Sequence, residues 1–312
     1  MIRLKLIPLS SSVLRRAVLD AIVAATIVAG VIAALTCLQN PANLARITDI
    51  HSGTLLAIAT PTAVTLVCGA QWWVHHRFPY RDFVQHNEVA GFIVAVAGSL
   101  YAVVLGFLTL VAWQQYSEAR QLVATETAAA TDAWHVAVGL PETSRHRVRV
   151  DVLTYANLMV SREWPAMTRG DEDRENPIVI MDAIDATEDF TPTNLRESNA
   201  QSATLTQLGV MHDERQKRLA DNRSGVTAFE WLVLAIGASC VIGFCWLFGM
   251  PNARIHLIMT SAVTVIITTT LVLLFELQYP FRSGLGIDSS DWSAVIDHIH
   301  WMQTGPQSTM RM

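Results

Sequence analysis

Charged residues are scarce in this chain. Only 16% of its 312 residues are charged, whereas 51% are hydrophobic and the mean hydropathy is +0.33. A soluble globular domain has about 25% charged residues, so the composition excludes an ordinary soluble protein and indicates an integral membrane protein. Residues 114–225 carry six more acids than bases, which argues against a nucleic-acid partner, because nucleic-acid binding requires a basic face.

Cysteine is also rare, and the familiar catalytic motifs are missing. All four cysteines fall inside apolar runs, which predicts small buried hydrophobic side chains and excludes a disulfide framework or a zinc site. The sequence contains no phosphate-binding glycine loop, nucleophile elbow or metalloprotease helix. The histidines near positions 75–86 and 298–300 lack a complete ligand set for a metal ion. We therefore expect neither an enzyme nor a bound cofactor or metal.

Long apolar runs are present instead. Five of them could each cross about 30 Å of hydrocarbon as a helix, at 17–38, 53–74, 91–113, 226–248 and 255–277. Residues 114–225 hold 18 of the 27 acids and 12 of the 22 bases, which indicates a water-exposed segment. The pattern predicts an all-α polytopic membrane protein with five transmembrane helices and a helical soluble domain inserted between helices three and four.

The predicted divisions follow from these runs. They are an N-terminal transmembrane hairpin (1–84), a third transmembrane helix (85–113), a soluble helical bundle (114–225), a C-terminal transmembrane hairpin (226–286), and an amphipathic segment with a tail (287–312). Within the bundle, we expect one helix from Pro141 to Arg162 and a short helix over 177–190. A third helix should start at Thr191-Pro192 and run to about Asn222. The amphipathic segment fits a helix on the membrane surface.

The third run has no stop signal where the membrane should end. Between Trp113 and Gly139 the chain has neither glycine nor proline, so nothing there breaks a helix. We predict one helix from about Glu88 to Gly139, about 75 Å long, that projects roughly 40 Å into water. Such a helix would couple the membrane and the soluble domain.

Two stripes of side chains in the membrane runs are candidate functional surfaces. Small residues recur at helical spacing on the third run: Gly91, Ala95, Gly98, Ala102 and Gly106. They predict either close helix packing in lipid or the lining of a narrow pore. On the fifth run, Thr260, Thr264 and Thr268 form a hydroxyl stripe. These hydroxyls either bond within the helix bundle or contact an ion.

Several stretches together resemble the bestrophin-like family of bacterial membrane proteins, over about residues 85–298. The segments that carry the resemblance are Asn87-Glu88, Leu100 to Phe107, Trp113, Tyr155, Glu163-Trp164-Pro165, Arg215, Arg218 and Pro280-Phe281. The family takes its name from bestrophins, which are pentameric anion channels with a helical soluble domain between two pairs of membrane helices. One additional helix stands at the front of the present chain.

The resemblance also suggests a constriction. Val104-Leu105-Gly106-Phe107 is similar to the bestrophin neck, where aromatic side chains narrow the pore. Phe107 matches one of these aromatics, whereas Val103 stands where another is expected. The acidic calcium clasp of animal bestrophins has no recognisable counterpart here.

Membrane orientation receives conflicting signals. The amino terminus, the 77–81 loop and Arg254 hold seven bases, against Arg46 and Arg282 on the opposite side. The positive-inside rule therefore places the soluble domain outside. The resemblance, and a cluster of bases over 215–223, favour the inside.

Two functions fit this sequence. The first is an oligomeric channel, for inorganic anions by resemblance to bestrophins, in the inner (cytoplasmic) membrane of a bacterium. The third helix would line the pore, with Phe107 at a constriction. The alternative is a non-conducting membrane sensor or scaffold whose helical domain binds a partner protein. The expected partners are the lipid bilayer and further copies of the chain, with no nucleic acid.

Overall fold

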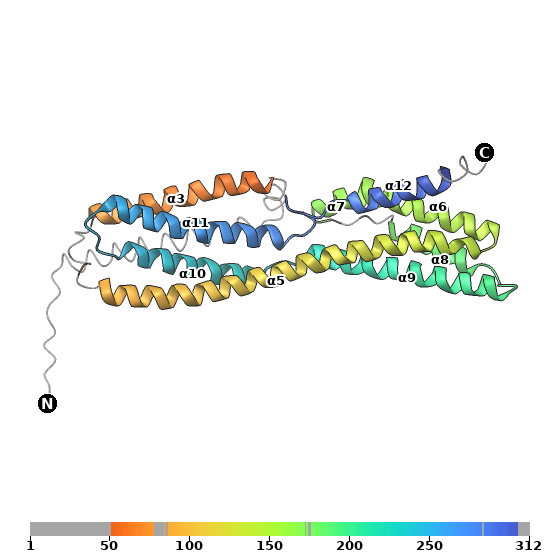
Figure 1. The fold of residues 1–312 in the computed structure, drawn as a ribbon, viewed down its shortest axis with the longest axis horizontal. Coiled ribbons are helices and arrows are strands. Elements are labelled where there is room, and N and C mark those ends of the chain that lie inside the picture. The colour runs from red at the N-terminus through yellow and green to blue at the C-terminus, as the bar shows by residue number, and fades with distance from the viewer. Residues whose placement is uncertain are drawn as a thin grey trace, which may run out of the picture.

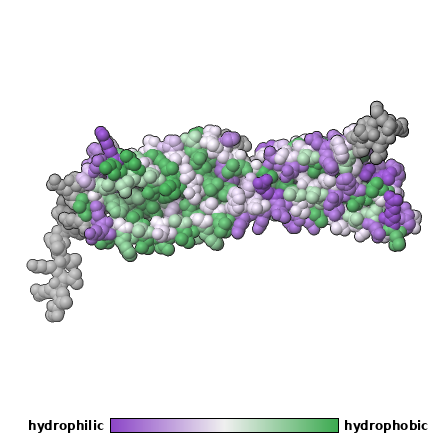
Figure 2. Space-filling view, viewed as in Figure 1, coloured by the Kyte–Doolittle hydropathy of each residue, from purple (hydrophilic) through white to green (hydrophobic). Residues whose placement is uncertain are grey.

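The computed structural model describes residues 51–77, 84, 87–171, 173, 176–282 and 284–304. In these residues every regular element is helical. The molecule is an elongated rod whose two halves are joined end to end (Figure 1). Hydrophobic residues cover most of the visible surface of one half, whereas polar residues are mixed over the other (Figure 2). The first apolar run, 17–38, lies outside the described residues.

Helix α5 (Asn87–Val136) runs through both halves (Figure 1). Its 50 residues form one α-helix, and a short 3-10 turn (Ala137–Gly139) ends it. The predicted continuity across the membrane boundary is therefore confirmed. At 1.5 Å per residue the helix is about 75 Å long.

The apolar half contains α3 (Ser52–Arg77), α10 (Ala228–Trp246) and α11 (Ala253–Leu277) beside the first part of α5. These four helices are long and apolar enough to span a membrane. Local sequence explains how the hairpin helices start. Thr227 and Glu230 form a capping box on α10, and the Asn252 side chain accepts hydrogen bonds from two backbone N–H groups of α11.

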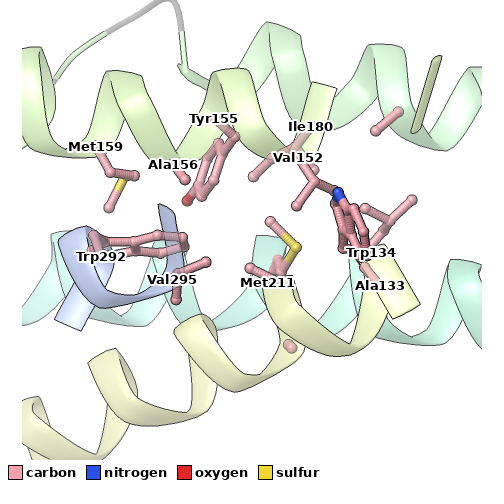
Figure 3. Packing of buried hydrophobic residues seen from close by; sticks show 14 of the residues in the cluster. Ala133, Trp134, Val152, Tyr155, Ala156, Met159, Ile180, Met211, Trp292 and Val295 are labelled. Atoms are coloured by element: carbon pink, nitrogen blue, oxygen red, sulfur yellow. The ribbon is translucent and has the colours of Figure 1, made fainter. Parts of the chain in front are cut away.

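The polar half contains α6 (Glu142–Leu158), α7 (Trp164–Thr168), α8 (Asn176–Glu188), α9 (Leu195–Arg223) and α12 (Ser290–Thr304). Helix α9 lies along the second part of α5, and α6 packs on α8. The core between them is apolar (Figure 3). Within this core the Trp292 ring of α12 meets the Tyr155 ring of α6 edge to face, with 5.3 Å between centroids (Figure 3).

Three expectations about this half were wrong. The helix that starts after Pro141 does not end at Arg162, because a π-helical turn (Met159–Glu163) carries it directly into α7. Helix α9 is capped by Asn194, three residues after the predicted Thr191. Helix α12 does not lie on a membrane surface: Trp292 and two further apolar side chains are buried against the soluble bundle.

Candidate pore helix and buried junction

One face of α5 packs inside the subunit. In the membrane half its buried side chains are Tyr101, Leu105 and Ala112, which join a cluster with α10 and α11. Gly237 of α10 makes room for the Tyr101 ring, because a Cβ at that position would collide with it. Helix α5 therefore has a fixed rotation against its own hairpin, and the residues on its other faces are left for other contacts.

Among the described residues, little packs against the predicted small-residue stripe. A Cβ at Gly98 or Gly106 would meet no atom within 4 Å, and one at Gly91 would lie 3.8 Å from the Phe248 ring. Both alanines of the stripe, Ala95 and Ala102, are exposed. The described helices thus leave most of the stripe available for other contacts.

Phe107 lies on a different face from the stripe. It follows Gly106 by one residue, which turns it about 100° around the helix. It shares a line with Leu100 and Val103, and these three side chains are 64%, 65% and 69% exposed, respectively. A ring of α5 helices around one axis could therefore present the Phe107 line or the stripe to that axis, but not both.

The threonine stripe of α11 lies largely inside the subunit. Thr260 and Thr264 are 2% and 1% exposed, and Thr268 is half-buried. The Thr264 hydroxyl donates to the Thr260 carbonyl oxygen at 2.8 Å, the usual local bond of a membrane threonine. This placement favours a bracing role over ion contact.

The family-motif residues at the two ends of the membrane half have structural contacts. The Asn87 side chain donates to the Gly249 carbonyl at 3.1 Å and accepts from the Gly249 N–H at 2.9 Å, which ties the start of α5 to the α10–α11 turn. Glu88 beside it is exposed. At the other end, the exposed Trp113 ring stacks on Tyr116, with 6.1 Å between centroids.

Two further motifs that are distant in sequence meet at the junction of the halves. The Trp164 ring meets the Phe281 ring edge to face at 6.0 Å, and its Nε1–H donates to the Ile287 carbonyl at 3.0 Å. Pro165 lies in the first turn of α7, where proline is tolerated. The Pro280 carbonyl accepts from the Ile287 N–H at 2.7 Å. The loop after α11 is thereby folded against the bundle.

The same loop is fastened to the membrane helices. The Tyr116 hydroxyl of α5 donates to the Leu285 carbonyl at 2.8 Å. The buried Glu276 carboxylate accepts from the Ser52 hydroxyl at 2.7 Å and from the Leu285 N–H at 3.2 Å. Helices α3, α5 and α11 therefore all contact this one loop.

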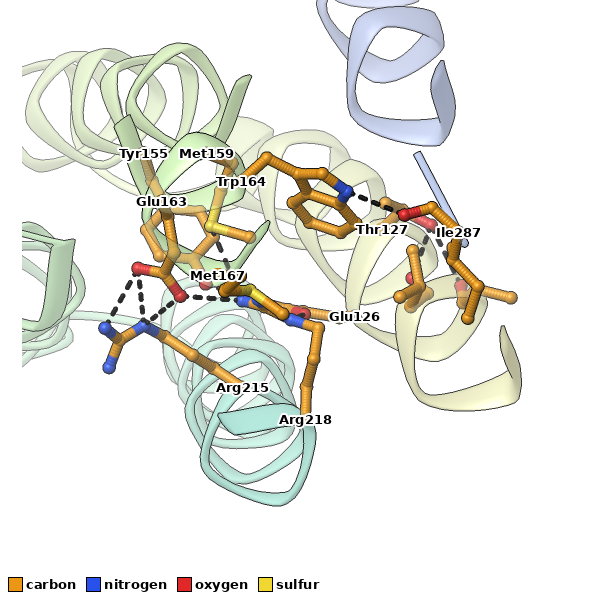
Figure 4. A network of polar contacts seen from close by, with 12 residues as sticks. Glu126, Thr127, Tyr155, Met159, Glu163, Trp164, Met167, Arg215, Arg218 and Ile287 are labelled. Atoms are coloured by element: carbon orange, nitrogen blue, oxygen red, sulfur yellow. Dashed lines mark hydrogen bonds and ion pairs between the residues drawn. The ribbon is translucent and has the colours of Figure 1, made fainter. Parts of the chain in front are cut away.

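Glu163 belongs to a buried network of four charges (Figure 4). Arg218 donates through Nε to Glu126 Oε2 at 2.8 Å and through Nη2 to Glu163 Oε1 at 2.9 Å. Arg215 holds Glu163 with Nε and Nη2, at 3.0 and 2.9 Å. The Tyr155 hydroxyl donates to Glu126. The charges of the two acidic and two basic side chains balance, and proteins tolerate buried charges when they are paired in this way.

Two stripes of buried residues, one on α5 and one on α9, create this network. Helix α5 buries Ala119, Val123, Glu126, Ala130 and Ala133, and α9 buries Leu208, Met211, Arg215, Arg218 and Asn222. Each set alternates steps of three and four residues, so each occupies one stripe of its helix. Sequence reasoning missed Glu126. The signal that could have found it is a single acid in an otherwise apolar stripe of α5.

The network shifts the pKa of two members. Burial alone would lower the pKa of Arg218, but Glu126 and Glu163 raise it above its usual value. Burial raises the pKa of Tyr155 well above its usual value, and Glu126 adds to this shift. Arg218 is therefore charged and Tyr155 is a neutral donor at any physiological pH. These two members therefore act as fixed hydrogen-bond donors.

Metal ligands are not brought together in the described part of the chain, where no three of His, Cys, Asp and Glu form a plausible site. His298 stacks on Trp301 and lies 6.0 Å from the His135 ring. His86 of the first candidate set lies outside the described residues.

Fold and junction together define a multi-pass helical membrane protein whose second half is a helical bundle with a more polar surface. The model of the bestrophin-like domain family matches residues 62–291. The chain therefore belongs to the bestrophin-like family. The comparison with curated proteins found no match.

Solved structures share the fold. A crystal structure of a bacterial bestrophin homolog from Klebsiella pneumoniae is similar with a TM-score of 0.56 at 16% identity, over 79% of this chain and 99% of that chain. Another variant of the same homolog is similar with a TM-score of 0.57 at 14% identity, over 77% of this chain and 99% of that chain. The crystal structure of a further membrane protein is similar with a TM-score of 0.60 at 14% identity, over 80% of this chain and 99% of that chain.

Proposed function

We propose that the chain forms an oligomeric membrane channel in which the Phe107 line of α5 faces the pore. One observation carries this proposal. A line of large apolar side chains, Leu100, Val103 and Phe107, is turned away from the described helices of the subunit, on the helix that runs into the soluble bundle. Several copies around an axis would turn this line into an apolar constriction, which can gate by dewetting. The fold shared with bestrophin homologs supports it.

Inorganic anions are the ions that the bestrophin resemblance suggests. The Phe107 line itself offers them no base. Continued toward the soluble end of α5, the same face carries Gln114, Glu118, Gln121 and Asp132, all exposed. The proposal of anions therefore rests on the resemblance, and the reversal potential in a salt gradient decides it.

Recordings from the purified full chain in planar bilayers test the channel. The expected result is a conductance that rises in Phe107→Ala, because a smaller side chain widens the constriction. Phe229→Ala is the matched control, since Phe229 is similarly exposed but lies on α10. A silent protein that is also monomeric by native mass spectrometry would overturn the proposal, because one subunit has too few helices to enclose an aqueous path.

The second candidate is a non-conducting sensor or scaffold whose bundle binds a partner protein. The observation that favours it is the unbroken α5, which would transmit a change in the bundle to the membrane without any pore. A protein that is silent and monomeric, yet changes the exposure of Trp113 when its bundle is engaged, would support this function. A conducting oligomer would exclude it.

We further propose the bacterial inner membrane as the location, with the bundle outside. Arg77 ends α3 and Arg254 is the second residue of α11, and these two helix ends lie at the end of the rod opposite the bundle (Figure 1). The positive-inside rule puts that end in the cytoplasm, whereas the bestrophin resemblance puts the bundle there. Labelling of a single introduced cysteine in α8 by a membrane-impermeant reagent distinguishes the two orientations.

A further inference from the structure

A polar cleft opens on the soluble bundle next to the membrane half. Its volume is about 640 Å³. Its charged and hydroxyl-bearing wall residues are Ser161, Arg162, Arg169, Asp171, Asp173 and Arg223. Among the described wall residues, three guanidinium groups and two carboxylates therefore surround one space.

The buried ion network shapes this cleft. The π-helical turn Met159–Glu163 directs Glu163 inward to Arg215, while Arg162, one residue earlier, is exposed at the cleft. Arg215 also donates through Nη2 to the Asp173 carbonyl at 3.0 Å, which holds the opposite wall. Gly170 closes α7 with a φ of +84°, a conformation that glycine adopts without strain. The cleft is thus preformed by contacts with the core.

A chain of contacts places the cleft at the level of the membrane surface. Arg282 packs against Gly170 of the cleft wall, donates through Nε to Asn222 at 3.0 Å, and lies over the Tyr279 ring at 5.4 Å. The Tyr279 ring in turn lies against Gly225, two residues before the cap of the membrane helix α10. Tyrosine and tryptophan at the ends of membrane helices mark the head-group layer.

We propose that this cleft binds the head group of an amine-bearing phospholipid, such as phosphatidylethanolamine. Guanidinium groups of Arg162, Arg169 and Arg223 suit the phosphate, since arginine matches phosphate geometry with paired donors. Asp171 and Asp173 suit the ammonium group. Basic pockets at the membrane surface are a known mode of lipid recognition. The paired carboxylates disfavour a free phosphate ion, which has no cation to offer them.

Native mass spectrometry of the purified full chain tests this assignment with three probes: phosphatidylethanolamine, phosphatidylglycerol and inorganic phosphate. The expected result is a retained phosphatidylethanolamine adduct, weaker retention of phosphatidylglycerol, and none of inorganic phosphate. Arg169→Gln should weaken the phosphatidylethanolamine adduct roughly tenfold, the scale of one lost charge-assisted hydrogen bond. Arg196→Gln is the control, because Arg196 is an exposed arginine at the distant start of α9.

A second variant keeps the test decisive if Arg169→Gln alters the fold. Asp171→Asn removes a carboxylate and should abolish the preference for phosphatidylethanolamine over phosphatidylglycerol while lipid binding persists. Equal binding of both lipids by the unmodified chain would overturn the role of the aspartates. Retention of inorganic phosphate as strong as that of lipid would identify a free-anion site. Adducts equally weakened by Arg196→Gln would show non-specific binding and overturn the proposal.

Discussion

Replacing Glu126 by glutamine should destabilise the soluble bundle by about 3–5 kcal/mol, the cost of removing one partner from a buried ion pair. The side chains of Glu126 and Arg218 are both 0% exposed. Glutamine keeps the size of the side chain, so the change removes charge and leaves volume almost unaltered. The buried group of two acids and two bases would be left with one uncompensated positive charge.

The contacts show which hydrogen bonds Glu126→Gln weakens. Arg218 donates to Glu126 at 2.8 and 3.2 Å and to Glu163 at 2.9 Å, so two of its three carboxylate contacts involve the altered residue. The Tyr155 hydroxyl also loses a charged acceptor. Hydrogen bonds to charged groups are stronger than neutral ones, and water cannot reach this site to replace them.

A second substitution should recover much of this loss. Arg218→Met in the Glu126→Gln background removes the uncompensated charge and leaves Glu163 paired with Arg215 at 2.9 Å. Buried ion pairs replaced by apolar side chains of similar volume often cost little. We therefore expect the double variant to be more stable than Glu126→Gln alone, which is a strong departure from additivity.

Unfolding of the full chain in mixed micelles, with a rising fraction of denaturing detergent, measures these differences through the fluorescence of the nine tryptophans. Lys217→Ala is the control, because Lys217 is the neighbour of Arg218 on α9 but pairs with Glu214 at the surface. It should leave stability almost unchanged. The reasoning fails if Glu126→Gln is no more harmful than this control, or if Arg218→Met adds a further loss.

Three other predictions concern separate parts of the chain. Burial, and then Glu118, raise the pKa of Asp221. The folded state thus binds a proton at Asp221 more tightly than the unfolded state, so the free energy of unfolding falls as pH rises through that raised pKa. Asp221→Asn should therefore raise the melting temperature at neutral pH, and this gain should vanish in acid. Trp292→Ala should cost about 3–5 kcal/mol and expose α12 to limited proteolysis. Asn87→Ala removes two hydrogen bonds to Gly249 and should cost about 1–3 kcal/mol, seen as faster amide exchange in the α10–α11 turn.

Local sequence was sufficient to predict the long helices. The absence of glycine and proline after Trp113 correctly predicted the unbroken α5, and the apolar runs located the four described membrane helices within a few residues. Helix propensity and hydropathy depend on residues that are near in sequence, so both can be predicted from a single sequence. The five-helix count stays a prediction, because the first run lies outside the described residues.

The errors arose where distant contacts decide between local alternatives. Pro165 indicates a helix break, but the first turn of α7 accommodates it after the π-helical turn, while Glu163 bonds to arginines 52 and 55 residues away in the sequence. For α9, Thr191 and Asn194 are both good caps. The amphipathic pattern of α12 fits a membrane surface as well as a bundle, and only the packing of Trp292 distinguishes them.

The network and the proposed pore belong to one rigid element. Glu126 lies 19 residues from Phe107 along α5, or about 28 Å, with no break between them. A rotation of α5 by about 100° would be needed to exchange Gly106 for Phe107 at an axis, and the same rotation would carry Glu126 away from Arg218. In a channel built on α5, the ion network in the soluble bundle would therefore hold the rotation of α5 within its own subunit, and the packing of subunits around the axis would select the face that meets the pore.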